Sequence, residues 1–326
     1  AGISTRRVQG LAPRRPCKMA SSAAARLVTG RVKGTGFGPG GLILRLVGTL
    51  DYTGKGTFHL LHDMDPCVLC DAPKDGCTIP TGKPDFGMHP HYGVIACSVV
   101  LDGAFSSSDN LNGADEHPNE AGGIYAASSG KGICHEERSI MDGSNLVQCV
   151  FRIPQDKLDL PPVVCQAKAA ELPVLTDASG TTTIVLVGSH NGVTSPGTPP
   201  AFPNAALLRI KVPPGQVFDL YLPEERSHGF VFPLAGCAKV GPTKDEVKRG
   251  TDELLCYGKG DVLSIENASE DVFDALLLSA QPLTTEPWVK GLGNNGFGIF
   301  RDVQEADAIM AKVIAAGTDF TYKTLS

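Results

Sequence analysis

The chain has 326 residues, 42% of them hydrophobic and 20% charged, with a formal net charge of −6 at pH 7. This balance is typical of a globular protein and excludes a disordered chain, and the length suffices for two domains of ordinary size. No apolar run approaches the roughly 20 residues that span a bilayer, and the negative charge argues against direct nucleic-acid binding, which needs a basic face.

Residues 1–40 differ in composition from the rest of the chain. They contain no acidic residue, and their basic residues are Arg6, Arg7, Arg14, Arg15, Lys18, Arg26, Arg31 and Lys33. An Arg-rich, Ser-rich, acid-poor leader is typical of plastid or mitochondrial transit peptides, and a disordered basic tail explains it equally well. Met19 is an alternative start that would leave residues 1–18 outside the mature protein. We expect residues 1–40 to be disordered.

Cysteine usage bears on the compartment. The ten cysteines are scattered rather than arranged in a framework, which favours reduced thiols inside the cell, in cytoplasm, nucleus or an organelle. Cys67, Cys70 and Cys77 include a Cys-x-x-Cys pair that can hold zinc or act as a redox pair. Because no second pair follows at finger spacing, a small loop with incidental thiols is the favoured interpretation.

Residues 87–103 combine two histidines with an expected strand, Gly-Met-His-Pro-His-Tyr-Gly-Val-Ile-Ala-Cys-Ser-Val-Val-Leu-Asp-Gly. Pro90 biases its neighbours toward an extended conformation, and in an extended chain residues i and i+2 share a face. His89 and His91 should therefore project into the same space. The apolar run 94–101 predicts a buried strand that ends at the Asp102-Gly103 turn.

A second fragment, residues 130–137, reads Gly-Lys-Gly-Ile-Cys-His-Glu-Glu. The same alternation places His135 and Glu137 on one face and Glu136 on the other. Three imidazoles and a carboxylate suit iron or another divalent transition metal. Single histidines on strands are commonly just packed or solvated, but two pairs at this spacing beside Gly-rich turns favour a metal site.

The second half of the chain shows the same rhythm of strands and turns, with segments at 206–212, 213–223, 229–236, 260–267 and 274–280. The spacing predicts a second small barrel. We expect an N-terminal domain over 41–187 with the metal site, a linker over 188–200 and a C-terminal domain over 201–326. His228 has no partner two residues on, so no second metal site is expected, and His117 and His190 are taken as inert. Residues 303–316 predict an amphipathic helix.

Three motifs resemble the successive signatures of the pirin family of bicupins: Gly87-Met-His-Pro-His-Tyr-Gly, Val100-Leu-Asp-Gly-Ala-Phe and Gly130-Lys-Gly-Ile-Cys-His-Glu-Glu. The resemblance covers roughly residues 55–320. It implies an all-β fold of two cupin (jelly-roll type) β-barrels in tandem, with a short C-terminal helix. It also implies His89, His91, His135 and Glu137 as the metal ligands, the set that the spacing selects.

The sequence departs from the family beside these motifs. Tyr92 stands where pirins usually carry Arg, and Ile95 stands where ordinary cupins place a Glu ligand. The carboxylate of a metal centre would then come from Glu137. Cys134 and Glu136 replace apolar and small neighbours, so these changes alter the pocket wall and leave the ligand set intact.

The resemblance implies an Fe(II)-dependent dioxygenase of the quercetin 2,3-dioxygenase type, with Glu137 as general base toward a small aromatic or flavonol-like substrate. One alternative is a non-catalytic coregulator of transcription that senses iron or redox state. Another is a structural bicupin recruited by protein partners to an organelle assembly. For each we expect a monomer without a membrane span or direct nucleic-acid contact.

Overall fold

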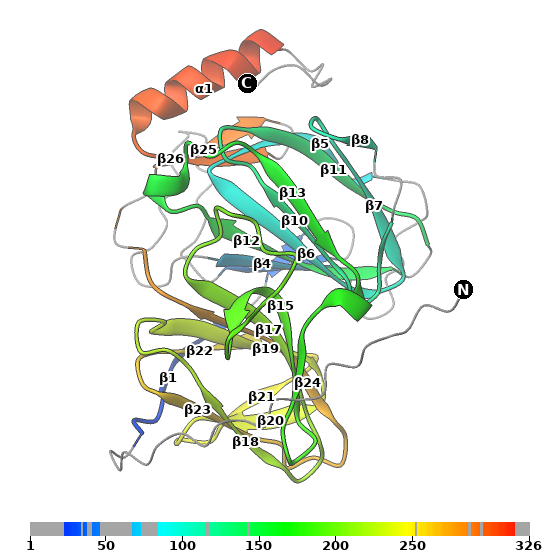
Figure 1. Cartoon of the computed structure of the whole chain (residues 1–326), viewed down its shortest axis with the longest axis vertical. Coiled ribbons are helices and arrows are strands. Elements are labelled where there is room, and N and C mark those ends of the chain that lie inside the picture. Colours follow the sequence, from blue (N-terminus) through cyan, green and yellow to red (C-terminus); the bar gives the residue numbers. More distant parts are fainter. Residues whose placement is uncertain are drawn as a thin grey trace, which may run out of the picture.

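The computed structural model describes residues 23–33, 35–37, 41–45, 67–72, 84–114, 118–141, 144–251, 253–283, 285, 288–293 and 296–316. In these ranges the strands form four sheets, which make up two β-barrels, and a helix follows the last strand. The barrels are stacked along the long axis of the molecule, and the helix covers the far end of the N-terminal barrel (Figure 1). The expected all-β fold of two barrels with a short C-terminal helix is confirmed.

Two sheets form the N-terminal barrel, in the orders β13-β10-β6-β12-β4-β3-β2 and β25-β26-β5-β11-β7-β8, with β9 paired to β7. The strands of the first are β2 (Thr35–Phe37), β3 (Gly41–Arg45), β4 (Cys67–Ala72), β6 (Val94–Asp102), β10 (Ile124–Ser128), β12 (Asn145–Arg152) and β13 (Val163–Ala167). Those of the second are β5 (Pro84–Tyr92), β7 (Ala104–Asp109), β8 (Gly113–Ala114), β9 (Asn119–Glu120), β11 (Ile133–Ser139), β25 (Trp288–Gly293) and β26 (Gly296–Phe300). The two histidine motifs therefore lie on adjacent strands, β5 and β11.

The C-terminal barrel consists of an eight-stranded sheet, β1-β22-β19-β24-β17-β15-β14 with β16 paired to β15, and a four-stranded sheet, β18-β23-β20-β21. The eight strands are β1 (Val28–Lys33), β14 (Val174–Thr176), β15 (Thr182–His190), β16 (Val193–Thr194), β17 (Ala205–Val212), β19 (His228–Ala235), β22 (Glu253–Tyr257) and β24 (Phe273–Ala280). The four are β18 (Val217–Tyr221), β20 (Cys237–Val240), β21 (Asp245–Lys248) and β23 (Val262–Glu266). Of two 3₁₀ turns, η1 (Gln155–Lys157) lies between β12 and β13 of the N-terminal barrel, and η2 (Ala169–Glu171) leads from β13 to β14 of the C-terminal barrel.

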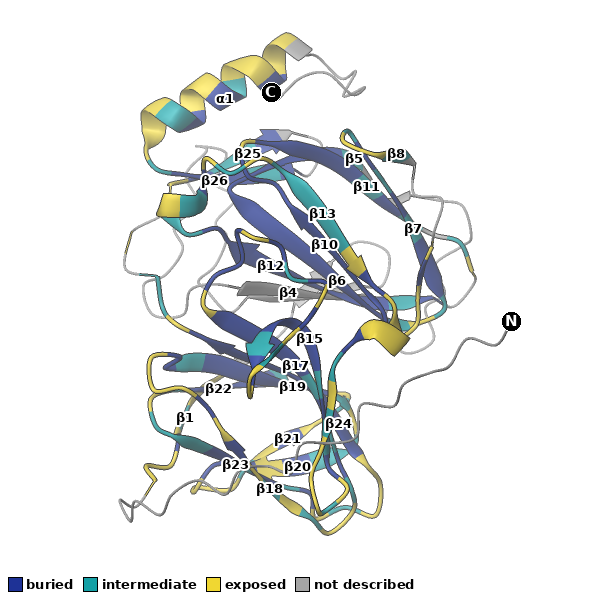
Figure 2. Cartoon of the chain, viewed as in Figure 1, coloured by how far each residue is buried: buried dark blue, intermediate teal, exposed yellow. Residues whose placement is uncertain are grey.

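Because side chains alternate along β6, one face of this strand packs against the C-terminal barrel and the other faces the interior of the N-terminal barrel. Ile95, Cys97 and Val99 are fully buried in a core that also contains Leu207 and Phe230 of the C-terminal barrel. Because successive strand residues face opposite sides, Val94, Ala96 and Ser98 are directed into the N-terminal barrel. The two large sheets thus pack face to face through one apolar layer (Figure 2).

A separate apolar core fills the C-terminal barrel. Its members include Leu208, Val231, Leu255, Ile265 and Leu277, all fully buried. Strands β17, β19, β22 and β24 contribute to both cores through opposite faces. In the described residues the interior of this barrel is therefore packed with apolar side chains.

The described part of the basic leader belongs to the fold, which corrects the expectation that residues 1–40 are disordered. Strand β1 pairs antiparallel with β22 of the C-terminal barrel. Just before it, Arg26 is fully buried and donates hydrogen bonds to the carbonyls of Arg226 and Pro223, at 2.6 and 2.8 Å. A transit-like composition concealed a short strand that completes the edge of the eight-stranded sheet.

The C-terminal end of the chain returns to the N-terminal barrel, which corrects the boundary placed at 201–326. Strand β26 pairs in parallel with β5, and α1 (Val303–Ala316) packs Ala306, Ile309 and Val313 against Tyr92 and Phe300. The amphipathic helix is confirmed, although Ile314 on it is 70% exposed. Within the described ranges no helix has the length and apolar character that crossing a membrane requires.

The expected linker lies inside the C-terminal barrel. Residues 188–200 comprise the end of β15 and most of its connection to β17, the adjacent strand of the same sheet, and β16 folds back on β15 within this segment. Ser195 is buried and donates to the carbonyl of Leu186 at 2.6 Å. The Pro, Gly and Ser residues of segment 188–200 form a tight connection between strands rather than a spacer between domains.

Candidate metal centre

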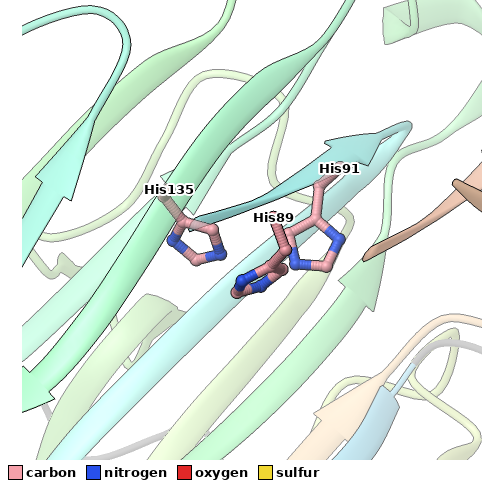
Figure 3. A group of neighbouring side chains, drawn as sticks. All are labelled: His89, His91 and His135. Carbon is pink, nitrogen blue, oxygen red and sulfur yellow. The ribbon is translucent and has the colours of Figure 1, made fainter. Parts of the chain in front are cut away.

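Strands β5 and β11 bring three histidines together inside the N-terminal barrel (Figure 3). In the antiparallel register His135 lies opposite His89, and Ile133 lies opposite His91. The ring centroids are 4.7 Å apart for His89 and His91, 4.6 Å for His89 and His135, and 5.1 Å for His91 and His135. One ring nitrogen of each lies within 4.8 Å of the other two, so the group could hold a metal ion.

Burial sets the protonation state of these imidazoles. All three are buried, and His135 is fully buried. Burial, reinforced by neighbouring His89, lowers the pKa of His91 from 6.5 to about 3. Burial, reinforced by neighbouring His89 and His91, lowers the pKa of His135 well below its usual value. Both rings are therefore neutral at physiological pH, the form whose lone pair binds a metal.

Hydrogen bonding supports the same assignment. Nδ1 of His91 lies 3.1 Å from the carbonyl oxygen of Phe297. A carbonyl only accepts, so Nδ1 carries the proton and Nε2 is left for ligation. Neither ring nitrogen of His135 has a hydrogen-bond partner among the described residues. A buried polar nitrogen without a partner is costly, and a bound cation would satisfy one of the two, so the residues present fit a divalent transition metal.

Glu137 lies two residues after His135 and is 1% exposed. Its carboxylate accepts hydrogen bonds from the hydroxyl of Ser98 on β6 and from Nε2 of Gln148 on β12, the latter at 2.5 Å. The pairing of β11 with β5 is irregular between His135 and Glu137, and Glu137 lies opposite Phe86. The carboxylate therefore reaches the opposite sheet of the barrel and stands outside the group of three imidazoles, so its role as a fourth ligand stays a prediction.

Glu136 is oriented differently from Glu137. It is half-buried and forms an ion pair with Arg138 at 2.8 Å. Alternation along β11 thus separates the two neighbouring carboxylates, one toward the barrel interior and one toward a cation on its own strand.

Sequence reasoning missed both partners of Glu137. Ser98 and Gln148 are polar residues inside the apolar runs 94–101 and 146–153. A buried polar residue needs a hydrogen-bond partner, and its presence in such a run was the available signal.

A pocket of about 190 Å³ lies beside the histidines. It is lined by Asp109, Asn112, Gly113, Tyr125, Val164 and Gln166. The Tyr125 ring lies nearly parallel to that of His135, with centroids 6.3 Å apart, and Asp109 is the strand neighbour of His135. The pocket thus combines polar side chains with one aromatic ring, next to the candidate ligands. These residues come from three segments without a shared spacing, so no local motif singled them out.

The other residues that the sequence singled out are not part of the histidine group where the structure describes them. Cys67 and Cys70 fall on strand β4, whereas Cys77 and His117 lie outside the described residues. His190 ends β15 and is buried. His228 begins β19, with Nδ1 3.1 Å from the hydroxyl of Ser227.

Two packed β-barrels, one with clustered buried imidazoles, define an all-β protein with a candidate metal site. The family model for pirin matches residues 45–150, which include both histidine motifs. Pirin-1 of Arabidopsis thaliana is 24% identical over 230 residues, or 70% of this chain and 75% of that protein. The chain is therefore similar to pirins over these residues, as its histidine motifs indicate.

Solved structures share the fold. A quercetin 2,3-dioxygenase from Acinetobacter baumannii superposes with a TM-score of 0.69 at 19% identity, over 93% of this chain and 100% of that one. The bacterial pirin YhhW from Escherichia coli, in complex with nickel(II), has a TM-score of 0.56 at 18% identity, over 78% of this chain and 99% of that one. At such identities the likeness concerns the fold.

Proposed function

We propose that the protein is an Fe(II)-dependent dioxygenase that opens the ring of a flavonol-like aromatic substrate. His89, His91 and His135 hold the metal, and Glu137 is the fourth ligand or the base beside it. The observation that carries the proposal is the buried group of three imidazoles, in which His91 and His135 are neutral and neither nitrogen of His135 has a partner in the described structure. The fold shared with a quercetin 2,3-dioxygenase supports the reaction class. The nickel(II) complex of YhhW supports a divalent metal.

When bound, Fe(II) supplies the redox chemistry that incorporation of dioxygen requires. The chain supplies orientation and proton transfer. The carbonyl of Phe297 fixes the ring of His91, and donors on Ser98 and Gln148 hold the Glu137 carboxylate in one place. A carboxylate so held can accept the proton of an enol hydroxyl.

The pocket next to His135 supports a small aromatic substrate. Tyr125 offers an aromatic surface for stacking, and Asp109, Asn112 and Gln166 offer groups that can bond to hydroxyls. A flavonol, planar and decorated with hydroxyl groups, matches this lining. The cavity volume of about 190 Å³ is below the roughly 300–1,000 Å³ of most small-molecule sites, so the pocket would hold one end of such a substrate rather than the whole molecule.

Turnover of quercetin tests the proposal. Purified protein reconstituted with Fe(II) should consume oxygen and bleach quercetin, and His135→Ala should abolish both. His228→Ala, in the other barrel, is the matched control and should retain full activity. A protein that binds Fe(II) but leaves the flavonol unchanged would refute the dioxygenase and favour the non-catalytic iron or redox sensor. In that case a pull-down with and without metal would separate the sensor from a structural bicupin.

We also propose that the protein acts inside the cell as a monomer that does not contact nucleic acid. The net charge of −6 supports the last point, because phosphate binding needs a basic surface. Light scattering on the purified protein gives the oligomeric state directly.

A further inference from the structure

One residue far along the chain holds the ring of His91. Phe297 on β26 lies opposite His91 in the parallel pairing of β26 with β5, 206 positions away in the sequence. Its carbonyl oxygen accepts from Nδ1 of His91 at 3.1 Å. Its ring also meets the imidazole edge-on, with centroids 5.0 Å apart and planes at 81°. Main chain and side chain of the same residue therefore restrain the ring.

Glycines on both sides of Phe297 allow this close approach. A Cβ on Gly296 would lie 2.2 Å from the carbonyl oxygen and 2.6 Å from Cδ of Pro90, which stands between His89 and His91. A Cβ on Gly298 would lie 2.4 Å from the Phe300 ring and 3.0 Å from Cβ of Tyr92. Neither glycine has a positive φ, so what each requires is space rather than an unusual conformation. A backbone carbonyl and a proline ring cannot rotate away, so alanine at 296 would push β26 from β5.

The end of β26 and the helix after it contact Tyr92, the residue next to His91. The hydroxyl of Tyr92 donates to Glu305 of α1 at 2.7 Å, and the Tyr92 ring stacks on Phe300 with centroids 4.9 Å apart. Arg301 completes the contact through a hydrogen bond to Glu305 at 2.8 Å. Tyr92 is the position where pirins usually carry Arg, so in this chain the changed residue anchors the C-terminal helix.

We propose that Phe297 is a positioning residue of the metal centre. Through its main-chain carbonyl, strand β26 fixes His91 as the Nδ1–H tautomer and so presents Nε2 to the metal, and Gly296 provides the space for it. A proton on Nε2 would block ligation, and loss of partners of this kind typically lowers metal affinity about 10- to 100-fold. The proposal rests on the metal-binding function proposed above, and its first readout needs no metal.

The tautomer can be measured in metal-free protein by long-range ¹H–¹⁵N NMR after ¹⁵N-histidine labelling, with His91→Gln to assign the signals. Wild type should show His91 protonated on Nδ1. Gly296→Ala should lose that preference and bind Ni(II), measured by calorimetry, about 10- to 100-fold more weakly. Gly30→Ala is the matched control, because a Cβ there meets nothing within 4 Å, and it should match wild type in both readouts. Phe297→Leu keeps the carbonyl and should retain the tautomer.

The outcomes separate this proposal from the proposed function. Nε2–H on His91 in wild type overturns it, whether or not Gly296→Ala folds. A folded Gly296→Ala variant with an unchanged tautomer and Ni(II) affinity overturns it as well. If wild type shows Nδ1–H on His91 but binds no Ni(II), the proposed metal centre is refuted, whereas the orientation of His91 by β26 is supported.

Discussion

The carboxylate of Glu137 is held by two donors from the sheet opposite its own, Ser98 and Gln148. Glu137→Gln would replace an acceptor oxygen by an amide, and one orientation of that amide would face the donor of Gln148. We expect the variant to weaken metal binding appreciably and to abolish oxygenase turnover, because the anionic oxygen is gone. Metal content and flavonol bleaching are the measurements.

Glu136→Gln is the matched control for that variant. The Glu136 carboxylate pairs with Arg138, whose side chain is 41% exposed, so its loss should change neither readout. If Glu136→Gln were the damaging substitution, the register of β11 would be off by one residue. If neither mattered, the site would be a centre of three histidines without a carboxylate base.

His190 gives the stability of the protein a dependence on pH. Burial, with a smaller contribution from neighbouring Arg226, lowers its pKa from 6.5 to about 4. Below pH 6.5 the unfolded chain takes up a proton that the folded chain refuses, so the free energy of unfolding falls as the pH drops from 6.5 toward 4. The limit for this one group is about 3 kcal/mol.

Urea unfolding at pH 7 and pH 4.5 tests this expectation, with His190→Gln beside wild type. The buried histidines of the metal site contribute equally in wild type and in His190→Gln, so the difference in stability loss between these two proteins reports His190. The variant should lose less stability between these pH values than wild type. Equal losses would show that His190 accepts its proton in the folded state.

At the scale of single residues, local pattern predicted the three histidines. Two pairs at i, i+2 show which side chains share a face, and the structure brings His89, His91 and His135 together. The partners that orient them were not predictable in this way. Phe297 acts through its main chain from a distant strand, and alternation within a strand carries no information about which strands pair.

At the scale of elements, strand β1 and the arginine before it join the leader to the C-terminal barrel. Deleting residues 1–33 would expose the edge of β22 and remove the donors to the carbonyls of Arg226, Pro223 and Gly258. Each buried carbonyl left without a partner costs on the order of 1–3 kcal/mol. We therefore expect a loss of several kcal/mol in the free energy of unfolding, whereas composition alone had predicted a disordered leader.

Urea unfolding of the variant lacking residues 1–33, compared with one lacking residues 1–22, isolates the contribution of β1 and Arg26. Arg26→Met, which keeps most of the stem volume but removes the donors, should reproduce part of the loss. Equal stability of the two truncated proteins would show that β1 contributes nothing to the barrel.

For the molecule as a whole, a shared apolar core should make the two barrels unfold together. Residues of both barrels form that core, and the chain ends cross over, β1 to the C-terminal barrel and β26 to the N-terminal one. The single tryptophan, Trp288, lies on β25 and reports the N-terminal barrel, whereas far-ultraviolet circular dichroism reports all strands. The two urea transitions should coincide. A separate early transition of tryptophan fluorescence would show that the barrels are independent.

The tandem barrels could be predicted because the rhythm of strands and turns runs through both halves of the chain. The crossing of the ends could not, since it depends on pairings such as Phe297 with His91 that lie far apart in the sequence. The domain boundary predicted at 188–200 rested on the Pro and Gly content of that segment, but in the structure these residues turn the chain between β15 and β17. Composition indicates where the chain turns, whereas which strands then pair is decided by tertiary packing.

We expect one metal to bind per chain, on the three clustered histidines. Elemental analysis after reconstitution with Fe(II) and removal of excess metal tests it most directly, applied to wild type, His135→Ala and His228→Ala. We expect one equivalent in wild type and in His228→Ala, and a large loss in His135→Ala. No bound metal in wild type, or a full equivalent retained by His135→Ala, would contradict the account.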